Sequence, residues 1–128
     1  MGNEGTSGMK WTLRLEELVQ LVAAVFLLAD FQAAWYWYLV LAIGPDVGML
    51  GYLVGPRTGA FTYNLLHHKG LAIALAAAGV LLVVNPLLWL GLAMFGHAAL
   101  DRMLGYGLKF PDSFQHTHLG WIGRQGPR

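Results

Sequence analysis

The sequence predicts an all-α protein: a four-transmembrane-helix bundle with a short interfacial segment between helices 2 and 3 and a cytoplasmic C-terminal tail. Composition is the first reason. Of 128 residues, 56% are hydrophobic and 12% charged, about half the charged share of an ordinary soluble domain. Patterning is the second, because the apolar residues gather in four long stretches, at about Leu13–Ala29, Ala33–Gly51, Leu71–Val84 and Leu87–Leu100.

The third reason is that all eight lysines and arginines can be placed on one side of a membrane. The two short connections, 30–32 and 85–86, contain no basic residue. The basic residues precede the first stretch, separate the second from the third, or lie at and beyond the end of the fourth: Lys10, Arg14, Arg57, Lys69, Arg102, Lys109, Arg124 and Arg128. Because loop bias in Lys and Arg sets orientation, we expect a multi-pass protein of the inner (plasma) membrane with both termini in the cytoplasm.

The first two helices follow from their end signals. Residues 1–10 are rich in Gly, Ser, Thr and Asn and predict a disordered tail, and the transmembrane domain is expected over 11–104. The second helix opens with an aromatic belt, 35–38, and should kink at Gly44-Pro45, where a neighbour can satisfy the freed carbonyl. Its glycines at 44, 48 and 51 favour close helix approach, through which a homo-oligomer could form.

The second half contains two further spans and a tail. A turn at 55–59 precedes an amphipathic interfacial segment at Ala60–His68, and the third helix runs on to about Val84. Asn85-Pro86 breaks the apolar run, and the fourth helix covers Leu87 to about Leu104. Residues 105–128 are expected to form a cytoplasmic tail that packs on the bundle at least to Gly120, with a disordered end.

The polar residues converge at the predicted cytoplasmic face, which holds all five histidines and nearly all the acids. Ionisable groups at membrane depth usually face the bundle interior and often mark function. His97 and Asp101 are spaced i, i+4 on one helix face, and Asp46 and His67 lie at similar depth. These four are candidate ligands for a divalent metal, Zn, Fe or Mn. For His97 and Asp101 alone, the alternative is a helix-stabilising hydrogen bond.

Five further residues complete the candidate site. Glu16 and His118 are candidates for additional ligands or the general acid and base. Arg102, Lys109 and Asn64 are candidates for binding an anionic group such as a lipid phosphate. The net charge of +1 with no basic tract argues against a nucleic-acid partner, and the absence of cysteine excludes thiolate sites.

These motifs resemble the DUF4260 family of small bacterial integral membrane proteins of uncharacterised function. The resemblance covers about Leu13 to Gly120 and implies a small multi-pass membrane protein without indicating an activity. It is carried by Arg14-Leu15-Glu16, Pro45-Asp46, Met49–Tyr52, Gly55, Tyr63-Asn64, His67, His97, Asp101-Arg102, Gly105–Lys109 and Thr117–Gly120. A fainter resemblance is to membrane-bound metal-dependent hydrolases with Pro-Asp and His-x-x-x-Asp motifs, whose fuller histidine pattern this sequence lacks.

The leading hypothesis from the sequence is therefore a membrane-embedded metal-dependent hydrolase that acts on a lipid or anionic substrate at the cytoplasmic face. The expected partners are the lipid bilayer and a phosphate-bearing substrate. Two alternatives stay open: a non-enzymatic transporter, and a structural or assembly protein whose polar cluster is a hydrogen-bond network.

Overall fold

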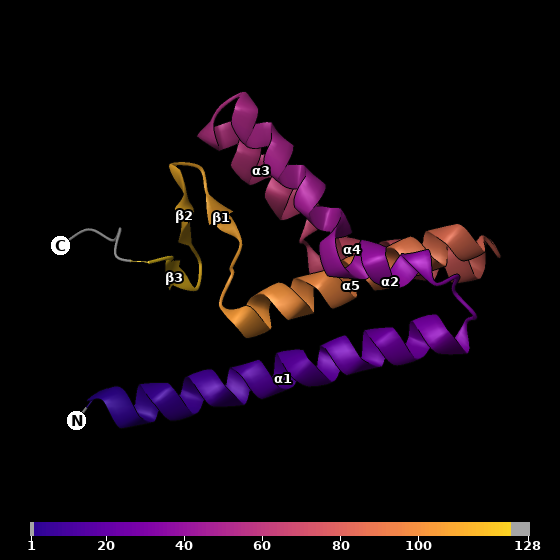
Figure 1. Cartoon of the computed structure of the whole chain (residues 1–128), viewed down its shortest axis with the longest axis horizontal. Helices are drawn as coiled ribbons and strands as arrows, with labels where there is room; N and C mark the ends of the chain where they lie inside the picture. Colours follow the sequence, from indigo (N-terminus) through magenta and orange to yellow (C-terminus); the bar gives the residue numbers. More distant parts are fainter. Residues whose placement is uncertain (1, 124–128) are drawn as a thin grey trace.

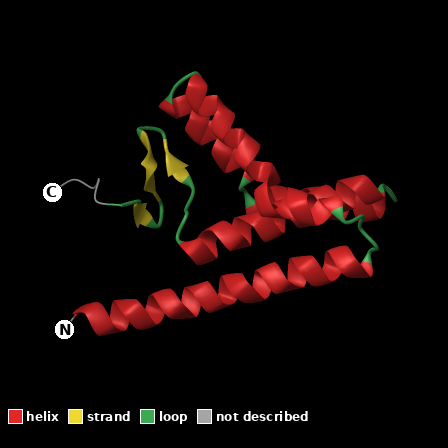
Figure 2. Ribbon diagram, in the orientation of Figure 1, coloured by secondary structure: helices red, strands yellow, loops and turns green. Residues whose placement is uncertain are grey.

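The computed structural model describes residues 2–123 and is mostly helical, which confirms the all-α class (Figure 2). In chain order it contains α1 (Gly2–Asp30), α2 (Tyr36–Ile43), the 3₁₀ helix η1 (Gly44–Leu53), α3 (Pro56–Leu66), α4 (Lys69–Leu81) and α5 (Asn85–Leu104). A small antiparallel sheet follows in the order β1 (Lys109–Phe110), β2 (Ser113–Thr117) and β3 (Gly120–Trp121). The sheet was not predicted, and it lies at the end of the molecule where α5 finishes (Figure 1).

Helix α5 is the centre of the fold, because α1, α2 and α4 all pack against it. The shared core consists of Ala24, Leu28, Leu41, Leu88, Leu92 and Ala93. Small residues on α5 set the close approach. A Cβ at Gly91 would lie 2.4 Å from the backbone nitrogen of Ala76, and one at Gly96 would lie 2.4 Å from the Leu41 side chain. Close packing between small residues is a common basis for helix association within membranes.

The predicted kink at Gly44-Pro45 is a change of helix type. The α-helix ends at Ile43, and the chain continues for ten residues as the 3₁₀ helix η1. Proline removes one α-helical hydrogen bond here. The Thr62 hydroxyl also donates to the Gly48 carbonyl at 2.6 Å, and a Cβ at Gly51 would collide with Thr62. The glycine face through which we expected oligomerisation thus packs on α3 of the same chain.

The predicted interfacial segment is a full helix, α3, and its axis meets α4 at 44°. The break falls at His67 and His68. His68 begins α4 as its N-cap, because its Nδ1 accepts from the Leu71 N–H at 3.0 Å. His67 ends α3 and is left at the inner side of the bend.

The two predicted disordered ends have different outcomes. Helix α1 begins at Gly2, so the tail expected over residues 1–10 is helical wherever the structure describes it. Once a helix is nucleated, each added residue costs little and gains a backbone bond. The predicted disordered end of the tail falls on residues 124–128, which lie outside the described residues, as does Met1. Strands β1 and β2 pack against α3.

Among residues 2–123, α5 is the one helix that is long and apolar enough to cross a membrane. Of its apolar 18-residue stretch, 56% is buried inside the protein. The bent pair α3 and α4 passes the same criterion when taken together. Four separate spans therefore remain a prediction, since α2 has only eight residues. Large apolar side chains are nevertheless exposed around the bundle, among them Val19, Phe26, Leu81 and Val83.

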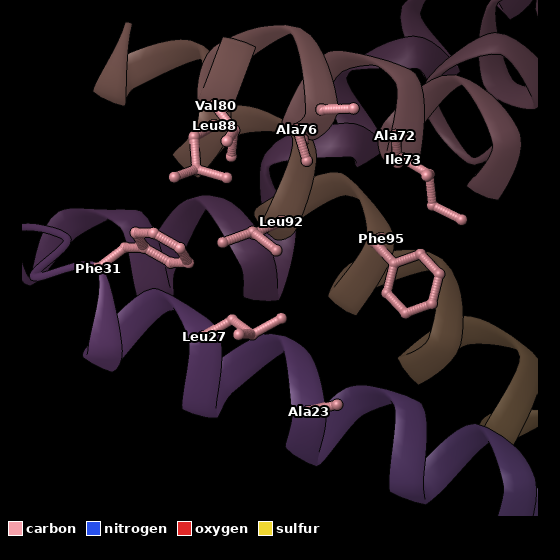
Figure 3. A pocket seen from close by; sticks show the side chains of 12 residues that line it. Ala23, Leu27, Phe31, Ala72, Ile73, Ala76, Val80, Leu88, Leu92 and Phe95 are labelled. Carbon is pink, nitrogen blue, oxygen red and sulfur yellow. The ribbon is translucent and has the colours of Figure 1, made fainter. Parts of the chain in front are cut away.

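Helices α1 and α4 pack on α5 without filling the space between them. The resulting cleft has a volume of about 460 Å³ and an almost wholly apolar lining that includes Leu27, Phe31, Ile73, Leu92 and Phe95 (Figure 3). An exposed apolar surface of this kind is typical of a protein that contacts lipid or another apolar partner.

Three helices end in the same Schellman geometry, but only one has glycine at the left-handed position. Gly105 at the end of α5 has φ 95°, whereas Gln32 after α1 and Val83 after α4 both have φ 56°. At Val83 the two diagnostic bonds are present, from Val84 N–H to the Gly79 carbonyl and from Val83 N–H to the Val80 carbonyl. A β-branched residue with positive φ is strained.

We therefore expect Val83→Gly to stabilise the fold by about 1 kcal/mol, because glycine adopts this conformation without a Cβ clash. Gly105→Ala should destabilise it by a similar amount. Thermal unfolding of the detergent-purified protein, followed by circular dichroism, measures both. A V83G protein that melts below wild type would contradict the strain assigned to this turn.

Candidate metal centre

Four polar side chains from three elements meet at the inner side of the α3–α4 bend. Asp46 lies in the first turn of η1, His67 follows the end of α3, and His97 and Asp101 lie one turn apart on α5. One ligand atom from each can be chosen so that all four lie within 4.8 Å of one another. We call these residues the tetrad. They are the four residues that the sequence predicted as candidate metal ligands, and the structure brings them together.

The spacing within the tetrad fits a metal ion. His97 Nε2 lies 3.0 Å from Asp46 Oδ1 and 3.6 Å from Asp101 Oδ1. His67 Nε2 lies 3.4 Å from Asp46 Oδ1 and 3.1 Å from Asp101 Oδ2. Ligands at zinc–nitrogen and zinc–oxygen bond lengths in a tetrahedron are about 3.3–3.6 Å apart. The tetrad therefore needs only small movements to surround an ion.

The orientation of His97 follows from Pro45. In an α-helix the N–H of residue 45 would bond to the Leu41 carbonyl, but proline has no N–H. The freed carbonyl lies 2.8 Å from His97 Nδ1. A carbonyl can only accept, so Nδ1 carries the hydrogen and Nε2, on the carboxylate side, is the atom with a free lone pair when the ring is neutral.

His67 has the same arrangement with a different carbonyl. Its Nδ1 lies 2.8 Å from the Tyr63 carbonyl, so Nδ1 is again the donor. Its Nε2 is fully buried and, within the described chain, makes no hydrogen bond, although both tetrad carboxylates are within 3.4 Å. A neutral His67 thus points a lone pair at carboxylates that can only accept. Such a pairing is unfavourable unless the ring is protonated or a metal ion lies between the groups.

Tyr63 supports two members of the tetrad, and the sequence analysis did not assign it to the site. Its hydroxyl donates to Asp101 Oδ2 at 2.8 Å, and its ring stacks on His67 with centroids 3.8 Å apart. Hydrogen bonds to ligating carboxylates are a regular feature of metal sites. Tyr63 and His67 are spaced i, i+4, which places them on one helix face. This spacing could have linked Tyr63 to the site only once His67 was known to belong to it.

Arg102 holds the backbone next to the tetrad. Its guanidinium donates to the His67 carbonyl at 3.1 Å and to the Tyr106 carbonyl at 3.2 Å. These bonds join the end of α3 to the end of α5 and to the start of the tail. The described contacts of Arg102 are therefore with backbone that positions His67.

Asn64 connects α3 to the sheet. Its amide nitrogen donates to the Lys109 carbonyl at 2.8 Å, and its amide oxygen accepts from the Lys109 N–H at 2.6 Å. Lys109 is buried behind the tetrad with Nζ over the rings of Phe114, Tyr63 and Tyr106, at 4.0, 4.7 and 5.9 Å from their centroids. Within the described residues, Nζ makes no hydrogen bond.

The two predicted acid–base residues lie outside the tetrad. Glu16 is exposed on α1, where it lines a shallow depression with its own helix neighbours. His118 is in the tail, and its Nδ1 accepts from the Leu108 N–H at 2.8 Å. Partial burial and the nearby Arg102 lower the pKa of His118. Their catalytic roles stay predictions of the sequence.

A cavity of about 280 Å³ gives access to the tetrad from the tail side. It is lined by Asp46, Met49, Tyr63, Asp101, Tyr106 and Phe114. The Asp46 side chain is 41% exposed, whereas those of His67 and His97 are at most 2% exposed. The histidines are thus shielded, and one carboxylate faces the open space.

Fold and site together define a helical protein with an internal His₂Asp₂ cluster that could hold a metal ion. A family model confirms the resemblance seen in the motifs. Residues 10–122 match DUF4260, described as a domain of unknown function, and the chain belongs to this family. Comparisons with curated proteins and with solved structures returned no match.

Lys109 makes the stability of the fold depend on pH. Burial lowers its pKa from 10.5 to about 8, and attraction to Asp101 opposes this only in part. The unfolded chain therefore binds more protons between these values, so stability should rise with pH across that window, by at most about 3 kcal/mol. Lys109→Met should flatten the rise and increase stability at pH 7, and melting temperatures at pH 7 to 10 measure both.

A matched control is Lys10→Met, because Lys10 is an exposed lysine on α1. It should keep the wild-type pH profile. If the wild-type and K109M profiles are parallel, then Lys109 is charged in the folded protein over the whole range, and its aromatic surroundings outweigh the effect of burial.

Proposed function

We propose that the tetrad binds one divalent metal ion, Zn, Fe or Mn, and that the protein is a metal-dependent hydrolase of the inner (plasma) membrane. The observation that carries the proposal is His67 Nε2. This atom is buried, lacks a hydrogen bond within the described residues and lies 3.1 Å from a carboxylate oxygen. A metal ion satisfies an imidazole lone pair and carboxylate oxygens at the same time.

The charge of the tetrad supports a divalent ion. Two carboxylates and two neutral imidazoles carry a combined charge of −2, which such an ion balances. Zinc, iron and manganese all accept mixed nitrogen and oxygen ligands. Each imidazole is oriented by a carbonyl on Nδ1, and Asp101 by the Tyr63 hydroxyl. This outer layer of hydrogen bonds is what fixes ligand orientation in known metal sites.

The cavity on the tail side supports hydrolysis. A divalent ion held by the tetrad supplies water activation near neutral pH. Asp46 is the most exposed of the four, and it lines the cavity. Its Oδ1 lies beside both imidazoles and would face the ion, so we assign its second carboxylate oxygen the role of accepting the proton of the attacking water. Tyr63 keeps Asp101 in place. The rings of Tyr106 and Phe114 form the opposite wall and restrict solvent.

The exposed apolar surface supports a membrane location. Residues such as Leu53, Val54, Leu81 and Val83 are each at least 80% exposed. Large apolar side chains with such high exposure are typical of a surface that contacts lipid or another apolar partner. In Figure 1 the turns that join α1 to α2 and α4 to α5 lie at one end, and the sheet lies at the other with the N-terminus. We place that second end in the cytoplasm, since the basic residues belong to it.

An anionic or lipid substrate is supported by the positive charge behind the cavity. The Lys109 ammonium lies against Tyr63 and Phe114, two residues that line the cavity. We propose that it attracts the negative group of the substrate, while Arg102 acts through the backbone of His67. Asn64 contributes by fixing the backbone position of Lys109.

Elemental analysis of protein purified without chelators tests the metal centre. We expect about one divalent ion per chain in wild type and less than about a tenth of that in His97→Gln/Asp101→Asn, because two of four ligands are lost. The matched control is Asp112→Asn/His116→Gln. This pair also has i, i+4 spacing, with 2.9 Å between the side chains, but Asp112 lies in the turn between β1 and β2 and His116 on β2. The control should retain full occupancy.

The competing roles give different results. Wild type that stays free of metal after reconstitution with each of the three ions removes the proposal. Loss of folded protein in the double mutant, without metal in wild type, indicates a structural hydrogen-bond network. Substrate flux across liposomes that depends on Asp46 but not on metal indicates transport.

Tyr63→Phe tests the layer around the tetrad. It removes only the hydroxyl that donates to Asp101 and keeps the ring on His67. We expect metal affinity to fall about 10-fold to 100-fold, as for other groups that orient a ligand. Competition with a chromophoric chelator measures it. A control at the exposed Tyr36 should leave affinity unchanged, and an unchanged Y63F affinity would remove Tyr63 from the site.

A further inference from the structure

A second cavity, of about 270 Å³, lies between α2, η1, α3, α4 and α5, which include the three elements that carry the tetrad. Its lining is apolar and includes Pro45, Val47, Leu66, Leu75, Leu90 and Met94. Three of these flank the tetrad in sequence: Pro45 and Val47 enclose Asp46, and Leu66 precedes His67. We call this cavity the groove. The groove is therefore lined by residues that adjoin two metal ligands along the chain.

One face of helix α5 carries residues of both the groove and the tetrad. Leu90, Met94, His97 and Asp101 are spaced four, three and four residues apart, so they form one stripe along the helix. The first two line the groove, and the last two belong to the tetrad. With a rise of 1.5 Å per residue, Leu90, the first apolar residue of the stripe, lies about 10 Å along the helix axis from His97, its first ionisable residue.

The tail side of the tetrad has the opposite character. There the cavity walls contain Asp46, Asp101 and Tyr63, with the Lys109 ammonium behind the aromatic rings. The elements that carry the tetrad thus line both an apolar cavity and a polar one with a positive charge at its back. A ligand that fills both must have an alkyl chain at one end and an anionic group at the other.

The groove is also open toward the surroundings of the protein. Val47 is 57% exposed and Leu65 45% exposed at its rim. A chain can therefore enter sideways from the bilayer and does not have to pass through the tail. We infer that the ligand of the tetrad is a membrane amphiphile whose alkyl chain lies in the groove and whose anionic head reaches the metal. This inference rests on the proposed metal centre and specifies its substrate class.

The larger cleft in Figure 3 does not meet these conditions. It lies between α1, α4 and α5, and none of its lining residues directly precedes or follows a tetrad residue in sequence. Because both cavities are lined by α4, the cleft provides a matched control for substitutions in the groove.

Alkylphosphonates of increasing chain length test the inference. The full-length protein in nanodiscs, loaded with Mn²⁺, would be titrated calorimetrically with ethyl-, butyl-, hexyl- and octylphosphonate. We expect affinity to increase as much as about fourfold per methylene group while the chain is being buried. Phosphorus relaxation by Mn²⁺ should show that the head lies at the metal for every chain length.

Leu75→Trp in the groove should abolish the chain-length gain and leave ethylphosphonate affinity unchanged. Ile73→Trp on the same helix, which lines the cleft instead, should behave as wild type. Val47→Trp, at an exposed position of the groove, provides a second test if L75W does not fold, with the exposed Leu50→Trp as its control.

The possible failures are distinguishable. Phosphonates that bind at the metal with equal chain-length gain in wild type, L75W, V47W and I73W overturn the inference but leave the metal centre intact, since the chain then senses only the bilayer. Protein that binds no Mn²⁺, and shows no phosphorus relaxation, overturns both the metal centre and this inference.

Discussion

The missing N–H of Pro45 is the constraint on which the site depends. It leaves the Leu41 carbonyl without an α-helical partner, and this carbonyl is buried against α5, where an unsatisfied acceptor is costly. His97 supplies the donor at 2.8 Å. That hydrogen bond fixes the ring and its tautomer, and it directs Nε2 toward Asp46, one residue beyond the proline. One backbone defect thus places a carboxylate and orients the imidazole that faces it.

The rest of the tetrad is built around α5. Small residues bring α4 and α2 close to this helix, and the bend between α3 and α4 leaves His67 opposite His97 and Asp101. Arg102 and Asn64 then attach the tail to the same region through backbone hydrogen bonds. The sheet is consequently part of the site, because it contributes the Phe114 ring of the cavity wall and the buried Lys109.

The carboxylates of the tetrad and the ammonium group of Lys109 are not paired with each other. Two carboxylates face each other across the tetrad, while the nearest buried cation, Lys109, lies behind aromatic rings and makes no described hydrogen bond with them. The tetrad could therefore hold a cation from solution. The positive charge behind the cavity is available to attract an anion into the space next to it.

The sequence by itself determined the helical class, the family and the four candidate ligands. Apolar runs separated by Asn85-Pro86 and Gly44-Pro45, together with the i, i+4 spacing of His97 and Asp101, were sufficient because these signals are local. The freed carbonyl at the proline was also foreseeable, but the residue that would satisfy it was not.

Only the tertiary structure decided the arrangement around the tetrad. Tyr63, the Arg102 bonds to backbone, the Asn64 bridge and the burial of Lys109 join residues 35 to 45 positions apart, and no local pattern encodes such pairings. The sheet of the tail is likewise too short for strand periodicity to be detected, and it forms because α3 offers its backbone a partner and a surface to pack on. Local chemistry could propose the ligands, but their convergence required the packing of α3 and η1 against α5.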